Sequence, residues 1–268
     1  GASLGNVTFV SGMTFSGTGG SLIPLATSGT MNITSNGLVL SGLSVGTSGG
    51  GNITLLDALN LGTGALSHNN AGTIDTGGFS VTANNFQSNG SAARTLTLGA
   101  STITLTGTGS VWDNSGTNLT VTANTSTIII SDTGASSKTF VGGGVSTYNN
   151  LTITGGGSGT VDITGANTFN IFTINKPKTV RFTAATTNTF SSFIAAGDSA
   201  NIITISSITA ATHTLSQASG TNSGRYLNLT NSIATGGATW NALNSTDVSG
   251  NTGWNFLRSS AGMLAFFD

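Results

Sequence analysis

Short runs of alternating apolar and polar residues recur along the chain, and clusters of Gly, Asn and Ser separate them. An apolar residue at every second position is typical of a β-strand with one buried face. No stretch repeats its apolar residues with the 3.6-residue period of a helix, so the pattern predicts an all-β protein. The clearest runs are Asn6–Val10, Thr30–Thr34, Thr95–Leu98, Thr102–Gly107, Asn118–Ala123, Ser126–Ser131, Asn150–Thr154, Thr160–Gly165, Thr179–Ala184 and Asn201–Ser206.

The spacing of these runs indicates how they are arranged. Comparable strands start at Thr160, Thr179, Asn201 and Arg225, which are 19, 22 and 24 residues apart. A loose repeat of about 20 residues is the length of one coil of a β-solenoid. We therefore expect an elongated parallel β-helix with Gly and Asn at its corners, where positive φ is needed. Coils of about 20 residues would give about 13 coils.

A β-sandwich or a set of jelly-roll repeats is the alternative fold, because its strands also alternate and its turns also contain Gly and Asn. A sandwich normally places charged residues on its outward faces. Here the outward positions are Thr, Ser and Asn. Stacked Thr and Asn side chains can hydrogen-bond from one coil to the next, and this favours the solenoid.

Aromatic residues close the repetitive part of the chain. Open solenoid ends expose unpaired backbone groups and need caps. We expect Trp240, Trp254 and Phe256 to form the C-terminal cap. This divides the chain into an N-terminal β-repeat region (1–94), β-solenoid coils (95–224), the aromatic cap (225–256) and an apolar tail (257–268).

The tail carries Met263, Leu264, Phe266 and Phe267. Such a compact apolar segment folds back on its own chain, docks on a neighbouring subunit or forms a disordered end. Docking would make the protein a homo-oligomer, and a trimer is one symmetry that we consider.

Composition excludes several classes of function. Charged residues make up 6% of the chain, Glu is absent and the net charge is −1, so no basic surface for nucleic acid exists. Cysteine is absent, which excludes disulfides and thiolate chemistry. No apolar run reaches the length of a membrane span, so we expect no membrane insertion. The chain begins at Gly1 rather than Met, which indicates processing or a fragment of a longer protein.

Candidate catalytic and metal-binding residues are few. A polysaccharide-degrading enzyme needs two converging carboxylates. Asp57 and Asp75 are 18 residues apart and Asp113 and Asp132 are 19 apart, so either pair could stack on adjacent coils. We favour a simpler role for each Asp as a turn cap. His68 and His213 are isolated, and we expect neither a metal nor a cofactor.

One local basic segment stands out. Lys176 and Lys178 flank Pro177, and Arg181 follows on the next strand. These cations could contact an acidic host glycan or a partner subunit, and plain solvated charge is the alternative. Thr-x-Thr pairs in Thr95–Gly109 also suggest an ice-binding surface, although their uneven spacing in the sequence argues against it.

The C-terminal stretch resembles a known group of proteins. YLNLTNSIATGGATWNALNSTDVSGNTGWNF at Tyr226–Phe256 resembles the ending of β-repeat virion and surface proteins of bacteriophages and bacteria. FVGGGVSTYNNLTITGGG at Phe140–Gly157 and NTFNIFTINKPKTVRFTA at Asn167–Ala184 resemble the repeating layers of that group. The resemblance implies a structural or attachment role, and no catalytic residue is carried over with it.

Together these observations predict a non-enzymatic β-solenoid that acts as a rigid spacer or attachment module. We expect it in a bacteriophage virion, as a tail fibre, head fibre or decoration protein. Its partners would be other virion or surface proteins and a host-surface glycan. A bacterial surface adhesin and a polysaccharide-degrading enzyme on the same fold are the alternatives.

Overall fold

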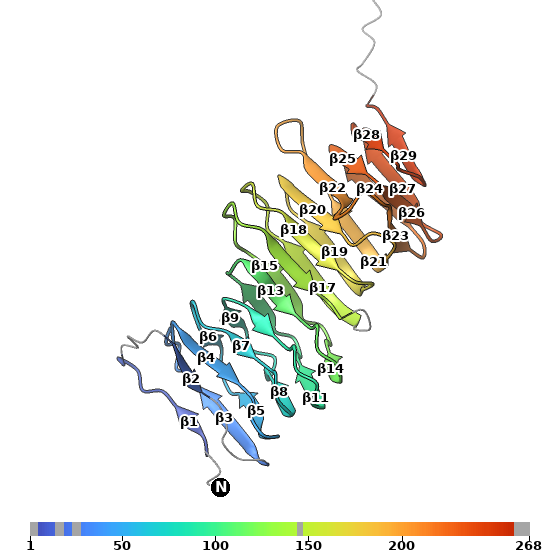
Figure 1. Cartoon of the computed structure of the whole chain (residues 1–268). Helices are drawn as coiled ribbons and strands as arrows, with labels where there is room; N and C mark the ends of the chain where they lie inside the picture. The colour runs from blue at the N-terminus through green and yellow to red at the C-terminus, as the bar shows by residue number, and fades with distance from the viewer. Residues whose placement is uncertain (1–4, 14–18, 23–27, 144–146, 260–268) are drawn as a thin grey trace, which may run out of the picture.

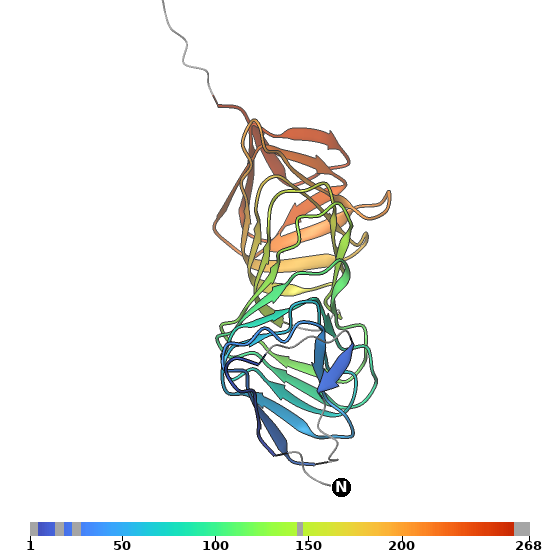
Figure 2. The same ribbon diagram turned by 90° about the vertical axis from the view of Figure 1, so that its left-hand side faces the viewer.

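The computed structural model describes residues 5–13, 19–22, 28–143 and 147–259. The described residues form 29 β-strands and no helix, and the named strands pair in parallel along the length of the molecule. The chain winds into a rod of stacked coils (Figure 1), and the view turned by 90° shows the stack from another side (Figure 2). The predicted all-β parallel solenoid is therefore confirmed, and the sandwich alternative is wrong. All ten runs listed from the sequence contain or overlap a strand.

Three sheets form the walls of the N-terminal half. Sheet A contains β1 (Val7–Thr8), β3 (Thr30–Thr34), β5 (Asn52–Leu55), β8 (Gly72–Asp75), β11 (Arg94–Thr97) and β14 (Leu119–Thr122). Sheet C contains β6 (Leu59–Asn60), β9 (Val81–Ala83), β12 (Thr102–Leu105), β15 (Thr127–Ile130), β17 (Thr147–Ile153), β19 (Thr168–Ile174), β21 (Thr187–Ala195), β23 (His213–Gln217) and β26 (Ser232–Thr235).

Sheet B runs the length of the rod. It contains β2 (Gly20–Leu22), β4 (Leu43–Gly46), β7 (Leu66–Ser67), β10 (Phe86–Gln87), β13 (Gly109–Asp113), β16 (Lys138–Val141), β18 (Val161–Thr164), β20 (Lys178–Phe182), β22 (Ile203–Ser207), β25 (Leu227–Thr230) and β28 (Thr246–Ser249). Each strand pairs with the one from the next coil, so this sheet forms a continuous hydrogen-bonded spine.

The coils are longer and less regular than the sequence predicted. Partners in sheet B are 18 positions apart at Leu229 and Asp247 but 28 apart at Trp112 and Phe140. The sheet has eleven strands, so the expectation of about 13 coils was too high. The reason is that corner loops absorb different lengths of chain, and both of these strand pairs also shift register at a bulge or irregularity.

The cross-section changes twice along the rod. Sheet A ends at β14, and above it the strands of sheet C lengthen from four residues in β15 to seven in β17 and nine in β21. At β21 the wall then forks. β23 pairs with Thr187–Phe190 of β21, and sheet D begins with β24 (Thr221–Arg225), β27 (Thr239–Leu243) and β29 (Trp254–Leu257).

Two buried amides satisfy the backbone where the wall forks. The side-chain oxygen of Gln217 accepts the N–H of Phe193 at 3.2 Å. The side chain of Asn222 donates to the carbonyl oxygen of Phe193 at 2.9 Å. Because β23 does not extend over Phe193, these two bonds replace the ladder bonds that a longer strand would have made.

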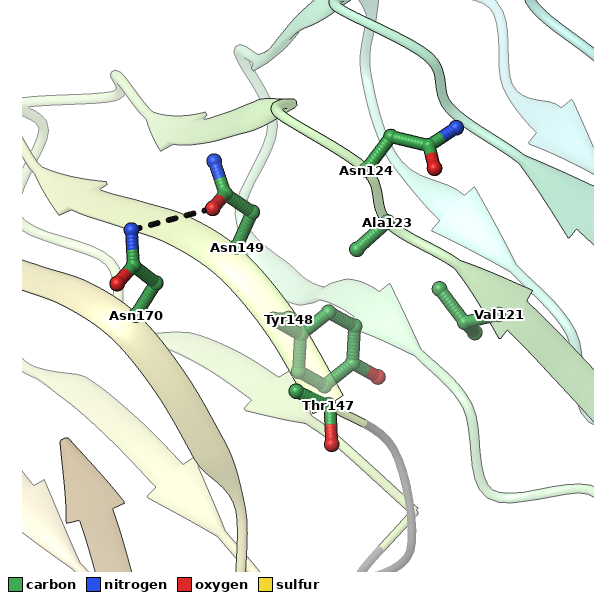
Figure 3. Close-up of a pocket in the computed structure, with 7 residues that line it drawn as sticks. All are labelled: Val121, Ala123, Asn124, Thr147, Tyr148, Asn149 and Asn170. Carbon is green, nitrogen blue, oxygen red and sulfur yellow. Dashed lines mark hydrogen bonds between the residues drawn. The ribbon is translucent and has the colours of Figure 1, made fainter. Parts of the chain in front are cut away.

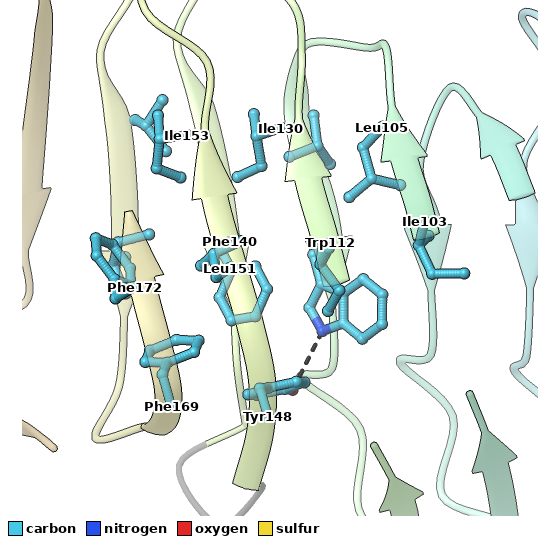
Figure 4. Packing of buried hydrophobic residues seen from close by; sticks show 14 of the residues in the cluster. Ile103, Leu105, Trp112, Ile130, Phe140, Tyr148, Leu151, Ile153, Phe169 and Phe172 are labelled. Atoms are coloured by element: carbon cyan, nitrogen blue, oxygen red, sulfur yellow. Dashed lines mark hydrogen bonds between the residues drawn. The ribbon is translucent and has the colours of Figure 1, made fainter. Parts of the chain in front are cut away.

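The interior is a set of columns in which the same side-chain position recurs on successive coils. In sheet C, one column runs from Leu59 to Phe193 through aliphatic and then aromatic residues: Leu59, Val81, Ile103, Ile128, Leu151, Phe172 and Phe193. All of these side chains are buried. Figure 4 shows the middle of this core, where the aliphatic rungs give way to rings.

Aromatic rings in contact continue through the upper two thirds of the core. The series starts with Phe86 and Trp112, whose centroids lie 4.2 Å apart, and ends with Trp240 and Trp254, 5.1 Å apart. Ring pairs at such distances contribute about 0.5–1.5 kcal/mol each beyond the area that they bury. The connecting rings are Phe140, Tyr148, Phe169, Phe172, Phe190 and Phe193.

The residues assigned to the C-terminal cap belong to this stack. Trp240 packs on Phe193 and donates its indole N–H to Thr235 O at 2.9 Å. Trp254 is 8% exposed in the last strand, and its indole donates to Ser232 Oγ at 3.2 Å. Phe256, beside it, is partly buried against the core. Residues 225–256 thus continue the coils, and Trp254 and Phe256 form the inward surface of the last strand of sheet D.

Candidate binding surfaces

The outer face of sheet A carries two ranks of small polar side chains. One rank contains Thr30, Asn52, Thr73, Thr95 and Thr120, and the other contains Asn32, Thr54, Asp75, Thr97 and Thr122. The Thr-x-Thr pairs are unevenly spaced in the sequence, yet they align on the sheet because the corner loops absorb the differences in chain length. The ranks are separated by about 7 Å within a strand and repeat about every 4.8 Å along the rod.

A hollow lies at the step where sheet A ends (Figure 3). It has a volume of about 290 Å³ and is lined by Val121, Ala123, Asn124, Thr147, Tyr148, Asn149 and Asn170. Asn170 donates to Asn149 Oδ1 at 3.2 Å, and Asn149 donates to Ser126 O at 2.9 Å, so two amides are fixed at its rim. Sequence reasoning missed these residues. The hollow arises where the strands lengthen from four residues in β15 to seven in β17. Amino-acid composition does not change at this point, so the sequence gives no sign of it.

A second hollow of about 290 Å³ lies on sheet B near the N-terminal end. Its polar lining comes from hydroxyl and amide side chains, among them Ser44, Ser67 and Gln87. Gly46 lines it at a close approach to the next strand, where a Cβ would lie 2.3 Å from Ser67 O. Neither this hollow nor the one beyond sheet A has a charged side chain among its described lining residues.

The aspartates mostly hold turns. Asp57 accepts the N–H groups of Ser35 and Asn36, both at 2.7 Å. Asp75, Asp113, Asp132 and Asp198 each accept the backbone N–H two residues further along the chain. This is the capping role that we favoured from the sequence.

The spacing that suggested carboxylate pairs does not place them on one ladder. Asp113 in sheet B has Gln87 and Val141 as its strand neighbours. Asp132 lies in the corner after sheet C and forms an ion pair with Lys138. In sheet A, Asp75 stacks on Thr54, whereas Asp57 lies in the corner beyond that strand. The register therefore aligns neither pair.

The basic segment is divided between surface and interior. Lys176 is exposed and forms an ion pair with Asp198 at 2.5 Å. Lys178 is 3% exposed and donates to Gly156 O at 2.9 Å, so its ammonium is inside the corner rather than on the surface. Arg181 makes two 2.7 Å bonds to Asp162 on the neighbouring strand. The three cations do not form one patch, because Lys178 and Arg181 lie on opposite faces of β20.

The pKa values of these charged groups follow their contacts. The hydrogen bond from Lys176 lowers the pKa of Asp198 to about 2. The hydrogen bond from Lys138 lowers the pKa of Asp132, and burial lowers that of Lys178. The pairing with Asp162 raises the pKa of Arg181. Pairing therefore favours the charged forms of Asp198, Asp132 and Arg181, whereas burial disfavours the charged form of Lys178.

The two histidines are buried in separate coils. His68 Nδ1 lies 2.9 Å from Thr47 Oγ1, and its Nε2 lies 3.0 Å from Thr95 O. His213 Nδ1 lies 2.8 Å from Ser207 Oγ, and its ring packs on Phe182 with 5.1 Å between centroids. Burial lowers the pKa of each to about 4, so both are neutral near pH 7.

No group of three or more His, Cys, Asp or Glu side chains that could hold a metal occurs among the described residues. In the same part of the chain, no helix is long and apolar enough to cross a membrane. The tail residues Met263, Leu264, Phe266 and Phe267 lie outside the described residues.

The fold and these surfaces define a parallel β-solenoid of about ten turns, with ranks of small polar side chains outside and an aromatic core inside. No protein-family model, curated protein or solved structure matches the chain.

Proposed function

We propose that this protein is a rigid structural and attachment module. The observation that carries the proposal is the continuous spine of sheet B, in which eleven parallel strands run from β2 to β28. A stack of this kind gains stability from each coil and its neighbours, and a long rod can form without disulfides. Its outward Thr, Ser and Asn side chains present hydroxyl and amide groups to a partner.

The setting that we propose is a virion, with the chain as a bacteriophage tail fibre, head fibre or decoration protein. This rests on the resemblance of Tyr226–Phe256 to β-repeat virion and surface proteins. A bacterial surface adhesin has the same requirements, namely a rigid spacer that holds a binding surface away from the particle or cell. The proposed partners are other virion or surface proteins, further copies of this chain and a host-surface glycan.

The mechanical part of the proposal is tested by solution scattering on the purified full chain. A rigid module gives one elongated shape whose cross-section and length match the stacked coils, and the shape does not change with ionic strength. Because the described ion pairs are few, salt has little to screen. A profile characteristic of a flexible chain would contradict the proposal.

The setting is tested by immunogold labelling of intact particles and cells from the source of this sequence. Label at regular sites on virions supports the virion role, and label on the cell envelope supports the adhesin role. Label confined to the cell interior would overturn both. Light scattering after size-exclusion chromatography measures the copy number of the proposed homo-oligomer, and a monomer at all accessible concentrations would rule out self-association of the isolated chain.

A further inference from the structure

Arg225 is an exposed cation whose side chain has no partner among the described residues. The chain has seven Lys and Arg residues. Five of them form ion pairs or hydrogen bonds through their side chains: Arg94, Lys138, Lys176, Lys178 and Arg181. Arg225 and Arg258 make no such contact with the described residues. Five of the seven cations are engaged within the chain, so the exposed guanidinium of Arg225 is available to a ligand.

Arg225 lines a hollow on the outer face of sheet D. The hollow has a volume of about 160 Å³ and is bounded by Ser223, Gly224, Arg225, Asn241, Leu243 and Leu257. Strand register explains how they meet. Arg225, Leu243 and Leu257 form one outward rank, and Ser223 and Asn241 stand side by side in the next.

The polar groups of this hollow are donors. The guanidinium can form two parallel bonds to one carboxylate. Asn255 donates to Asn241 Oδ1 at 3.4 Å, which leaves the Asn241 Nδ2 hydrogens without a described acceptor. The hydroxyl of Ser223 is exposed on the same strand as Arg225. Together they offer a positive charge and neutral donors to one anionic oxygen-rich group.

The apolar wall restricts which anion fits. Leu257 is 45% exposed, and Leu243 is half-buried beside it. Two leucines next to a guanidinium suit a ligand that has both a carboxylate and a C–H face, as an acidic sugar ring does. The volume is below the roughly 300 Å³ at which pockets for drug-sized ligands begin, so the hollow suits a single ring.

We propose that the Arg225 hollow binds a carboxylate-bearing sugar, with Arg225 as the carboxylate contact and Asn241 and Ser223 as contacts for ring hydroxyls. This inference rests on the proposed attachment function and names the class of glycan for it. It moves the acidic-glycan contact away from the basic segment around Pro177, whose cations already have partners.

The test is a titration of the full ¹⁵N-labelled chain with glucuronic acid, N-acetylneuraminic acid, glucose and acetate. We expect either acidic sugar to shift the Arg225 Nε–H, the Asn241 side-chain amide and the Gly224 amide. Glucose lacks the charge and acetate lacks the ring, so each should bind at least tenfold more weakly. Equal binding of acetate would overturn the sugar assignment, and no shift with either acid would overturn the site.

Arg225→Gln removes the charge on an exposed side chain, and Arg258→Gln is the matched control on the neighbouring free cation. Binding should fall at least tenfold in the first and stay within twofold in the second. Unchanged spectra at distant residues verify that both variants are folded. Equal loss in both variants, or in neither, would contradict the site.

The outcome is separable from that of the proposed function. Particles or cells that carry the chain but show no acidic-sugar binding would leave the attachment module intact and remove this site. Sugar binding by a chain absent from particles and cell surfaces would keep the site and remove the module.

Discussion

The side chain of Gln217 accepts the backbone N–H of Phe193 at 3.2 Å, in the interior of the fork between sheets C and D. Phe193 pairs with Phe172 of β19 on one side, but on the other side β23 covers β21 only as far as Phe190. Its N–H would otherwise be a buried donor without an acceptor. One glutamine thus allows the wall to divide without the loss of a backbone hydrogen bond.

We expect Gln217→Ala to lower the free energy of unfolding by about 1–3 kcal/mol, because it leaves this buried N–H unpaired. Chemical denaturation measures the loss. Ser216→Ala is the control, since Ser216 lies on the same strand with its side chain outward, and it should change stability by less than about 0.5 kcal/mol. Equal effects of the two substitutions would show that the amide does not hold the fork.

The corner glycines allow a second, geometric test. Gly157 and Gly109 both have φ of 68°, so alanine pays the same left-handed backbone cost of about 1–2 kcal/mol at each site. A Cβ at Gly157 would lie 1.6 Å from Thr133 O, whereas nothing lies within 4 Å of one at Gly109. We expect Gly157→Ala to destabilise the rod well beyond Gly109→Ala in thermal unfolding. Similar values would mean that the corner can relax.

The ion pairs should differ in strength because their burial differs. Lys138 is fully buried against Asp132 and Gly134 O, whereas Lys176 and Asp198 are exposed. Lys138→Met leaves Asp132 without its cation and Gly134 O without the Lys138 donor, and should cost on the order of 3 kcal/mol. Lys176→Met should cost less than about 1 kcal/mol. Equilibrium unfolding of the two variants measures both losses of stability. A larger loss in Lys176→Met than in Lys138→Met would contradict the prediction.

Acid should destabilise the protein through its histidines. Their pKa values are about 4 in the folded state and near 6.5 when unfolded, so the unfolded chain binds protons first. The stabilisation is complete above pH 6.5 and is lost as the pH falls toward 4, by up to about 3 kcal/mol per histidine. Asp198 titrates lower, near pH 2, so its effect falls outside this window.

Unfolding measured by urea between pH 7 and pH 4 tests this expectation. His213→Phe keeps a ring on Phe182 but cannot be protonated, so the pH slope in this window should fall by about half. Addition of His68→Phe to the His213→Phe variant should remove the rest of the slope, because neither buried histidine then remains. A slope that survives the double substitution would assign the acid effect to other groups.

Local sequence determined the strands of this protein. Alternation with Thr outside and Val, Ile or Phe inside, as at Thr102–Leu105 or Lys178–Phe182, specifies a strand with one buried face, and glycines at the corners permit positive φ. A repeat length near 20 residues was enough to indicate a solenoid. These properties depend on residues close in the chain, so they are readable without the fold.

The tertiary structure alone decided which coils share a wall and which side chains are left free. The end of sheet A at β14 and the fork at Phe193 depend on how strands from different coils align, and loops of variable length conceal that register. Lys176 and Lys178 both flank Pro177, yet only the structure shows that Lys178 is buried and Lys176 is exposed. Arg225 resembles any other cation in the sequence; its free guanidinium beside Asn241 and two leucines follows from the stacking of three strands.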